Sequence, residues 1–352
     1  MNKEIVRNIT EWYKQNSRDL PWRTNRNAYS VWISEIMLQQ TRIEAVIPYY
    51  VRFMEAFPDV FALADAEEEL LLKLWQGLGY YSRARNLKKA AQIIVSEYGG
   101  ALPKESKLLK KLPGIGDYTA GAIASIAYRM AEPAVDGNVL RIMMRLWASD
   151  DDVLLPAVKK KTEEALRKVY PNGDEARLLT EGLMELGQRI CTAKGEPKCE
   201  SCPIAEHCLA YRKDETSLYP VRIKKSKRRI EERTVILLCC NGRYALQKRP
   251  ETGLLASLWE FPNIEGRLLL SELSAYAAKL GGNAVDFYDA GEAKHIFTHL
   301  EWHMTGRIIE CTAPFGEFEW LLPEEIEAEY ALSSAFIPYI KAAFHHNEIM
   351  EK

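Results

Sequence analysis

The sequence predicts a multi-domain protein in which an all-α part precedes a smaller α+β part. Three observations predict this order. The length of 352 residues is enough for roughly two domains. Helical periodicity, interrupted by Pro and Gly, continues to about residue 210 without strand alternation of useful length. After residue 232 the pattern changes to strand, turn, strand.

The first part is a series of amphipathic helices. The first begins near the N-terminus and has Ile5, Ile9 and Trp12 on one face. The expected helices cover 2–15, 28–40, 44–56, 67–76, 82–98, 105–111, 117–128, 137–147, 158–169 and 174–190.

The second part opens with an apolar run at 233–240, which is typical of a buried strand. Asn241-Gly242 predicts a turn, and 243–249 predicts the returning strand. A helix is expected at 270–280, strands near 285–291, 302–311 and 315–321, and a last helix at 334–345. The predicted domains are therefore 1–211 and 233–352, with a linker at 212–232.

Charge is distributed unevenly along the chain although the formal net charge is only −2. Residues 212–233 carry nine Lys or Arg against four Asp or Glu, whereas 234–352 carry nine against 17. Lys224, Lys225 and Lys227 lie in this basic segment, which either contacts a polyanion or is a solvated linker. No apolar run is long enough to span a membrane, and the N-terminus lacks a signal-peptide pattern, so we expect a cytoplasmic protein.

Four of the seven cysteines lie within 18 residues, in the order Cys191-x7-Cys199-x2-Cys202-x5-Cys208. Four thiolates this close can hold a zinc ion or an iron–sulfur cluster. The single close pair flanked by lone cysteines favours the cluster. His207 is interpreted as structural because the fourth cysteine makes it unnecessary as a ligand.

Residues 112–122, Leu-Pro-Gly-Ile-Gly-Asp-Tyr-Thr-Ala-Gly-Ala, form a glycine-containing turn between two helices. Gly114 and Gly116 let backbone amides approach a phosphate at the start of the next helix. A turn that serves only tight helix packing is the alternative.

Two carboxylates stand out. Asp136, in Val135-Asp136-Gly137-Asn138, suits a helix N-cap, and the neighbouring amides would keep it ionised. Glu35 follows an apolar run, where burial would raise its pKa enough for proton donation near neutral pH. Taken alone, a glutamate in such a pattern is more often a solvated helix residue.

Together these segments resemble a known family, the helix–hairpin–helix DNA glycosylases with a four-cysteine cluster, and within it the adenine DNA glycosylases of the MutY type. The resemblance covers nearly the whole chain. It rests on 20–23, 34–41, 77–83, the hairpin, 135–138, the cysteines and 258–262.

The resemblance implies two helical subdomains that bind double-stranded DNA, flip out adenine paired with 8-oxoguanine or guanine, and cleave its glycosidic bond. Glu35 matches the general acid that protonates adenine, and Asp136 matches the carboxylate that stabilises the cationic sugar. Asn138 would orient Asp136 or the water, and Tyr118 would support the site.

Further residues match positions that contact DNA in the family. Arg23 and Glu181 are expected to line the adenine pocket, and Gln40 and Tyr80 are expected to enter the duplex. Trp22 and Leu38 are further expected substrate-binding residues. The hairpin residues expected at a phosphate are Gly114, Gly116 and Thr119.

The resemblance also implies a [4Fe–4S] cluster on loop 191–208 and a likeness of 233–352 to Nudix domains. Seven residues separate Cys191 from Cys199, one more than is usual in the family. The segment 253–281 lacks the paired glutamates of a working Nudix hydrolase, so this module should recognise 8-oxoguanine. Phe297, Thr298 and His299 correspond to the reading loop, where Thr298 replaces the usual serine.

Alternative functions differ in testable ways. An endonuclease III-like enzyme would carry a lysine at Tyr118, whose amine forms a Schiff base with the sugar. Tyrosine cannot, so we expect a monofunctional glycosylase that leaves an abasic site. A DNA-binding module without catalysis would not need Glu35 and Asp136 together, and a nucleotide hydrolase would need the missing metal motif. We expect a monomer, associated with the nucleoid through DNA.

Overall fold

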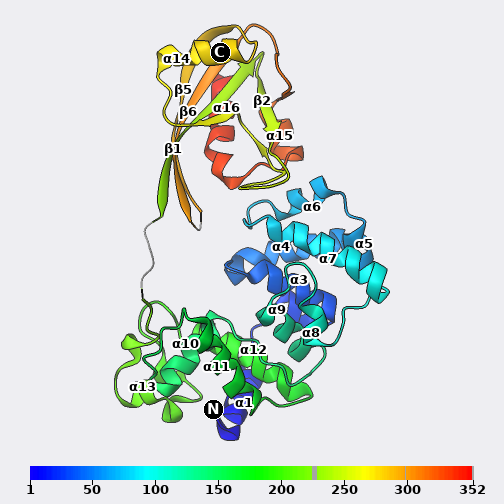
Figure 1. The fold of residues 1–352 in the computed structure, drawn as a ribbon, viewed down its shortest axis with the longest axis vertical. Coiled ribbons are helices and arrows are strands. Elements are labelled where there is room, and N and C mark those ends of the chain that lie inside the picture. Colours follow the sequence, from blue (N-terminus) through cyan, green and yellow to red (C-terminus); the bar gives the residue numbers. More distant parts are fainter. Residues whose placement is uncertain (224–227, 298, 351–352) are drawn as a thin grey trace. The chain divides into compact units, whose positions relative to one another are not determined.

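The computed structural model of the protein describes residues 1–223, 228–297 and 299–350. Lys224, Lys225 and Lys227 of the basic segment, and Thr298 of the expected reading loop, lie outside the described residues. The chain divides into two compact units: Met1–Ala66 with Asn86–Lys225, and Glu67–Arg85 with Ser226–Lys352 (Figure 1). The domain boundaries predicted from the sequence stay predictions.

Every regular element described before Arg229 is a helix, which confirms the predicted all-α part. The α-helices are α1 (Lys3–Asn16), α2 (Pro21–Thr24), α3 (Ala28–Leu38), α4 (Ile43–Ala56), α5 (Val60–Ala64), α6 (Glu68–Trp75), α7 (Ser82–Tyr98), α8 (Ser106–Leu109), α9 (Asp117–Ala122), α10 (Gly137–Trp147), α11 (Pro156–Arg167), α12 (Asp174–Arg189) and α13 (Leu209–Arg212). A π-helical turn, Ile123–Ala127, continues α9.

Helix α3 is apolar around most of its circumference, with buried residues from Tyr29 to Met37. Such a helix belongs inside a domain rather than on its surface. Asn27 caps its first turn by accepting a hydrogen bond from the Ser30 amide at 2.7 Å. Since α3 is held on all sides, a polar side chain on it has a fixed position and little access to water.

Helices α1, α10, α11 and α12 share one apolar core. Ile9 of α1, Met143 of α10 and Leu186 of α12 are fully buried in it. This core positions the N-terminus of α10 and the middle of α12, from which several expected site residues project. Among the described residues, no helix is both long and apolar enough to cross a membrane.

The second part contains a seven-stranded mixed sheet. Its strands are β1 (Arg229–Cys240), β2 (Arg243–Lys248), β3 (Trp259–Glu260), β4 (Asn263–Glu265), β5 (Ala284–Ile296), β6 (Leu300–Cys311) and β7 (Glu319–Leu321). The main order is β3-β2-β1-β6-β5; β4 also pairs with β1, and β7 with β2. Among the strands of the described residues, β1 and β6 are the only parallel pair, and the other pairs are antiparallel.

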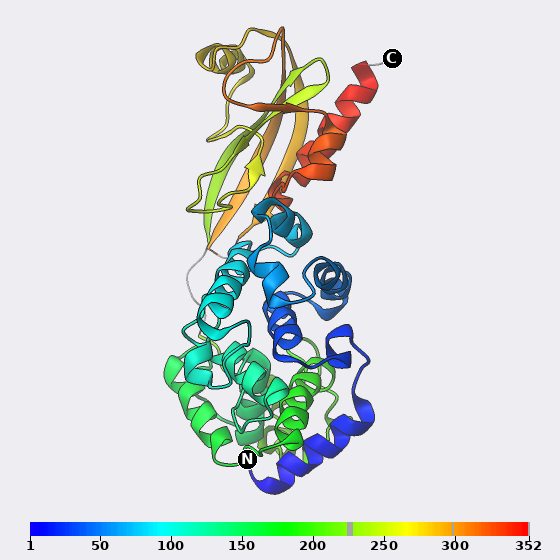
Figure 2. The ribbon, with the colours of Figure 1, turned by 90° about the vertical axis from the view of Figure 1, so that its right-hand side faces the viewer.

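Helices cover both faces of this sheet (Figure 2). Val235 and Leu237 of β1 pack towards α15 (Pro323–Glu329) and α16 (Ile337–Met350), whereas Ile236 and Leu238 pack towards α14 (Leu270–Lys279). Burial on both faces explains why β1 is a continuous apolar run rather than an alternating one. The α+β prediction is confirmed.

Several boundaries differ from those expected. Strand β1 begins at Arg229, four residues early, because its polar first residues pair in register with Leu300 and its neighbours on β6. The strand expected over 315–321 is confined to Glu319–Leu321, and the last helix begins at Ile337 after a 3₁₀ turn. The expected Asn241-Gly242 turn is confirmed, with positive φ at both residues.

Candidate active site

Helices α3 and α9 bring Glu35 and Tyr118 into contact. The Tyr118 hydroxyl donates a hydrogen bond to Oε2 of Glu35 at 2.7 Å. Glu35 is only 5% exposed and lies within the apolar helix α3. The solvated-helix interpretation of Glu35 is therefore wrong.

Burial raises the pKa of Glu35 to about 7. The hydrogen bond from Tyr118 and the positive charge of Arg23 oppose this rise, whereas the negative charges of Asp136 and Glu181 add to it. Glu35 is therefore substantially protonated near neutral pH, which is the state that a proton donor needs. Burial and the neighbouring carboxylates raise the pKa of Tyr118 well above its ordinary value, so its hydroxyl remains a donor.

Asp136 is the N-cap of α10. Its Oδ1 accepts hydrogen bonds from the backbone amides of Asn138 and Val139 at 2.9 and 2.8 Å, and its Oδ2 accepts one from the Asn138 side chain at 2.7 Å. Burial raises the pKa of Asp136, and these three hydrogen bonds lower it. The net effect is a raised pKa. The prediction that neighbouring amides keep Asp136 ionised therefore left out the opposing effect of burial. Asn138 fixes the orientation of the carboxylate.

Contacts with two residues, Arg141 and Gly187, fix the position of the Asn138 side chain. Arg141 donates from Nη2 to Oδ1 of Asn138 at 2.9 Å and from Nε to the carbonyl oxygen of Cys191 at 2.8 Å, which links α10 to the cysteine loop. Gly187 of α12 packs so closely that a Cβ added there would lie 2.7 Å from Cβ of Asn138. The sequence analysis identified neither residue.

Two adjoining cavities meet at Glu35. The smaller has an empty volume of about 410 Å³, and the larger of about 840 Å³. The smaller is lined by Leu20, Trp22, Arg23, Val31, Ser34, Glu35, Leu38, Ile43, Ile126, Glu181, Met184 and Gln188. Tyr118, Asp136 and Asn138 line the larger one together with Glu35 and Leu38. Arg23 and Glu181, expected at the adenine, thus share one cavity with the expected substrate-binding residues Trp22 and Leu38, and the catalytic candidates share the other.

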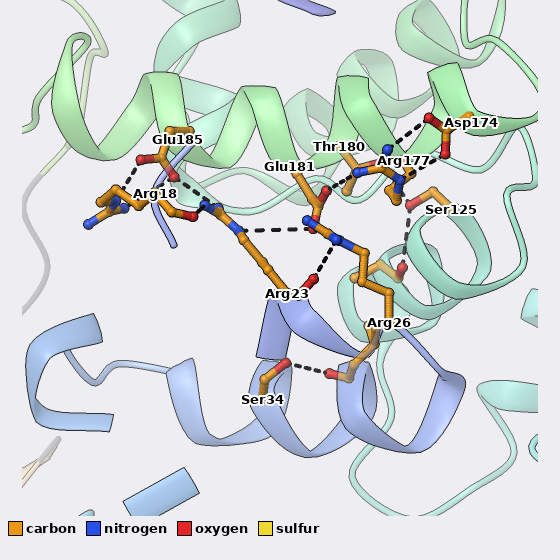
Figure 3. A network of polar contacts seen from close by, with 12 residues as sticks. Arg18, Arg23, Arg26, Ser34, Ser125, Asp174, Arg177, Thr180, Glu181 and Glu185 are labelled. Atoms are coloured by element: carbon orange, nitrogen blue, oxygen red, sulfur yellow. Dashed lines mark hydrogen bonds and ion pairs between the residues drawn. The ribbon is translucent and has the colours of Figure 1, made fainter. Parts of the chain in front are cut away.

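Charged side chains connect Arg23 and Glu181 in a network that Figure 3 shows. Glu181 accepts hydrogen bonds from Arg26 at 2.8 Å and Arg177 at 2.9 Å, while Arg23 lies 3.9 Å away. Nη2 of Arg23 donates to Glu185 at 2.8 Å. Both carboxylates come from the same face of α12, one turn apart.

Glu185 is fully buried, and Arg18 donates to it from the opposite side at 2.6 Å. Burial alone would raise the pKa of Glu185, but the hydrogen bonds from Arg18 and Arg23 lower it overall. Sequence reasoning missed Arg18, Arg26, Arg177 and Glu185. The i, i+4 spacing of Glu181 and Glu185 was the available signal.

The hairpin between α8 and α9 has the expected geometry in its glycines but not in Thr119. Gly114 has φ +78°, and Gly116 is the N-cap of α9. Thr119 is 2% exposed, and its hydroxyl accepts a hydrogen bond from the Gln39 amide at 3.4 Å. A contact between this hydroxyl and a phosphate does not fit this burial.

Gln40 and Tyr80, which were expected to enter the duplex, are both exposed and lie in different units. Both adopt the left-handed backbone conformation, with φ of 59° and 48°. Non-glycine residues rarely adopt it, and functional sites are where such strain concentrates.

The four cysteines line one cavity, with an empty volume of about 400 Å³. A cavity lined by four cysteine thiols suits either a zinc ion or an iron–sulfur cluster, because both take thiolate ligands. Gly195, in the loop between Cys191 and Cys199, has φ +70°.

Phe297 and His299 flank the turn from β5 to β6 in the second unit. The Phe297 ring packs edge-on against Trp302, with centroids 4.8 Å apart, and Trp302 is buried. His299 is exposed. The Phe297 side chain is thus held by packing, whereas His299 is exposed to solvent.

Comparison with known proteins supplies a family for each part. The model of the HhH-GPD superfamily of base excision DNA repair proteins matches residues 33–172, and that of the NUDIX domain matches 233–342. In structure, the chain is similar to a thermostable thymine-DNA glycosylase, with 29% identity and a TM-score of 0.54, covering 59% of this chain and 95% of that one. It is also similar to endonuclease III from a non-covalent DNA complex, with 26% identity and a TM-score of 0.50, covering 59% and 94%.

Curated relatives extend over both parts. The chain is 36% identical to the adenine DNA glycosylase of Arabidopsis thaliana over 85% of its own length, and it spans 56% of that relative. It is 35% identical to the mouse enzyme of the same name, with 90% and 74% covered. The chain is 34% identical to the adenine DNA glycosylase of Buchnera aphidicola from Acyrthosiphon pisum, over 86% of its own length and 85% of that relative. The chain therefore belongs to the adenine DNA glycosylase family.

Proposed function

We propose that this protein removes adenine paired with 8-oxoguanine or guanine from duplex DNA by hydrolysing its glycosidic bond. The observation that carries the proposal is the position of Glu35, a buried acid with a pKa raised to about 7 where two cavities meet. One cavity would hold the flipped base and the other the sugar, because the bond between them cannot be reached inside the stacked duplex.

Two carboxyl groups with different surroundings divide the chemistry. Protonated Glu35 would donate its proton to the adenine ring, which makes the base a better leaving group. Asp136, held by three hydrogen bonds in one orientation, would stabilise the positive charge that develops on the sugar. Tyr118 would support Glu35 through its hydrogen bond.

The adenine pocket would combine apolar walls with a fixed charged end. Trp22 packs edge-on against Tyr50 with centroids 5.4 Å apart, so its ring is held in place, and Leu38 lines the same cavity. Glu181 and Arg23 are held by the arginine–glutamate network. A carboxylate that already accepts two hydrogen bonds retains lone pairs for the amino group of adenine.

A monofunctional reaction follows from Tyr118. An amine attacking the sugar would form a Schiff base and allow strand cleavage, and a tyrosine hydroxyl at this place cannot. The proposed product is therefore an abasic site in an unbroken strand.

Cys191, Cys199, Cys202 and Cys208 would hold a [4Fe–4S] cluster in the cavity that they line. The cluster would supply structural cross-linking of the loop rather than catalysis. Arg145 donates to Sγ of Cys191 at 3.3 Å and to the Thr192 carbonyl oxygen at 2.9 Å, so a buried cation lies beside this sulfur.

The β5–β6 turn is proposed to read 8-oxoguanine through His299. We expect His299→Ala to reduce mainly the preference for 8-oxoguanine over guanine opposite adenine, because His299 is exposed while Phe297 anchors the turn. Single-turnover rates and affinities on the two duplexes measure this preference. An unchanged ratio would remove His299 from the reading loop.

The reaction should depend on pH through Glu35. Its acid form is required, and its pKa is raised to about 7, so excision should fall as the pH rises through about 7. Single-turnover rates between pH 5.5 and 9 (roughly the range in which buried acids titrate) would show this limb. A rate that is constant across this range would show that Glu35 does not donate the proton.

One assay tests the whole proposal. It uses duplexes with adenine opposite 8-oxoguanine, adenine opposite guanine, and thymine glycol opposite adenine, each with and without alkali. Cleavage of only the adenine strands, and only after alkali, is the expected result. Direct nicking at thymine glycol would instead indicate an endonuclease III-like enzyme, and no cleavage by protein with intact iron content would indicate a binding role.

A further inference from the structure

Three potential metal ligands meet in the second unit, and none of them has a role in the site described above. Sγ of Cys239, a carboxylate oxygen of Glu310 and a ring nitrogen of His346 all lie within 4.8 Å of one another. They come from β1, β6 and α16 respectively. Cys239 is 1% and His346 5% exposed, whereas Glu310 is partly exposed.

The fold places these side chains together by register and packing. Cys239 and Glu310 are direct partners across the parallel β1–β6 pair. Their neighbours in the core include Tyr339 and Ala343 of α16, and His346 follows on the same face of the helix, one turn after Ala343. The arrangement is thus fixed by the sheet and the last helix rather than by a loop.

Hydrogen bonding identifies which nitrogen of His346 is available. Nδ1 is 2.9 Å from the Tyr244 hydroxyl, and that hydroxyl also lies 2.9 Å from Oδ1 of Asn347, an acceptor. The same hydroxyl lies 3.2 Å from the carbonyl oxygen of Ala343, a second acceptor, and is hydrogen-bonded with the Cys239 sulfur. Because the hydroxyl has one proton for these acceptors, it accepts from Nδ1–H of His346. Nε2 of His346 therefore presents a lone pair, and it has no hydrogen-bond partner among the described side chains.

That lone pair faces another acceptor. Nε2 of His346 is 3.8 Å from Oε1 of Glu310, so a neutral ring leaves two electron-rich atoms opposed in a largely buried site. A proton or a metal ion between them removes this conflict. The Cys239 thiol beside the pair supplies the ligand type that a metal ion would use and a proton would not need.

We propose that Cys239, Glu310 and His346 form a zinc-binding site. A thiolate, an imidazole and a carboxylate are the ligand types that zinc takes in proteins, and a water would complete the tetrahedron. Tyr244 would act as the outer partner that fixes the imidazole. On binding, the thiol proton of Cys239 passes to solvent as the sulfur–zinc bond forms.

The distances allow this with a small contraction. Tetrahedral zinc places nitrogen and oxygen ligands ~3.3 Å apart, against the 3.8 Å between Nε2 of His346 and Oε1 of Glu310. The partly exposed side chain of Glu310 can rotate to provide this change and leaves an entry path. Bound zinc would fasten α16 to the centre of the sheet.

Zinc binding by the full-length protein tests the proposal. Protein with measured iron content is dialysed to equilibrium against zinc, and zinc and iron are determined together. We expect about one zinc per chain without loss of iron, and a higher unfolding temperature with zinc, because zinc would bind only the folded site. Glu310→Gln and Cys239→Ser should each weaken binding about tenfold or more.

Matched controls lie next to two of the ligands. Cys240 follows Cys239 on the opposite face of β1, and His345 is exposed beside His346. Cys240→Ser and His345→Ala should bind zinc as the unchanged protein does. If Cys239→Ser does not fold, Glu310→Gln decides, since its side chain is partly exposed. Wild-type protein that retains no zinc, variants that retain all of it, or zinc that replaces iron would each overturn the proposal.

Discussion

Glu35→Gln is expected to abolish adenine excision while leaving DNA affinity within a factor of about two. Glutamine has the same size and can still accept the Tyr118 hydrogen bond, but it has no acidic proton to give. The loss of a general acid should lower the single-turnover rate about 100- to 10,000-fold. Binding to a duplex with adenine opposite 8-oxoguanine and the excision rate are measured on the same preparation.

Stability provides an internal check on this variant. The pKa of Glu35 is raised on folding, so the folded protein loses stability as the pH rises from the ordinary carboxyl range to about 7. Glutamine does not ionise, and Glu35→Gln should lack this loss. Glu11→Gln, an exposed position on α1, is the matched control and should behave as wild type. Excision retained by Glu35→Gln would remove Glu35 from the acid role.

Asp136→Asn is the second substitution with a large expected effect. Asparagine caps helices about as well as aspartate, so α10 should keep its start. Its amide nitrogen would replace the oxygen that accepts from the Asn138 side chain, so the unfolding free energy should fall by about 1–3 kcal/mol. The negative charge next to the developing sugar cation is lost, and the excision rate should fall about 100- to 1,000-fold. Single-turnover rates and thermal unfolding measure the two effects separately.

A matched control exists for the capping part of this prediction. Asp59 is the N-cap of α5 and accepts from the Ala62 amide at 2.9 Å. Asp59→Asn makes the same chemical change at another helix start and should leave excision unchanged. Equal activity of Asp136→Asn and Asp59→Asn would mean that Asp136 serves only as a cap.

The sequence predicted most elements because their signals are local. The apolar circumference of α3, the Asn241-Gly242 turn and the N-cap character of Asp136 each depend on a few neighbouring residues. Glu35 and Tyr118 are far apart in the sequence, so it was the family resemblance that predicted their common site. The four cysteines were predicted by spacing, and they line one cavity.

The features that the sequence did not predict depend on contacts between residues far apart in the chain. Arg18 and Glu185 are 167 residues apart, and nothing near either indicates the other. The early start of β1 at Arg229 depends on its partner β6, about 70 residues later. Thr119 belongs to a motif whose glycines suit a phosphate, yet packing turns its hydroxyl inward. Local pattern identifies residue types, whereas burial decides which of their atoms remain available.

Gly187 shows how packing around this site limits the substitutions that the sequence can accept. The residue contributes no atom to the cavities, yet there is no room beside Asn138 for a methyl group. A change to alanine, the mildest that a glycine codon commonly yields, would displace the side chain that orients Asp136. In a survey of natural variants, such a change would look harmless by helix propensity and because Gly187 lines neither cavity. Its effect should be judged by Gly187's contact with Asn138 rather than by either criterion.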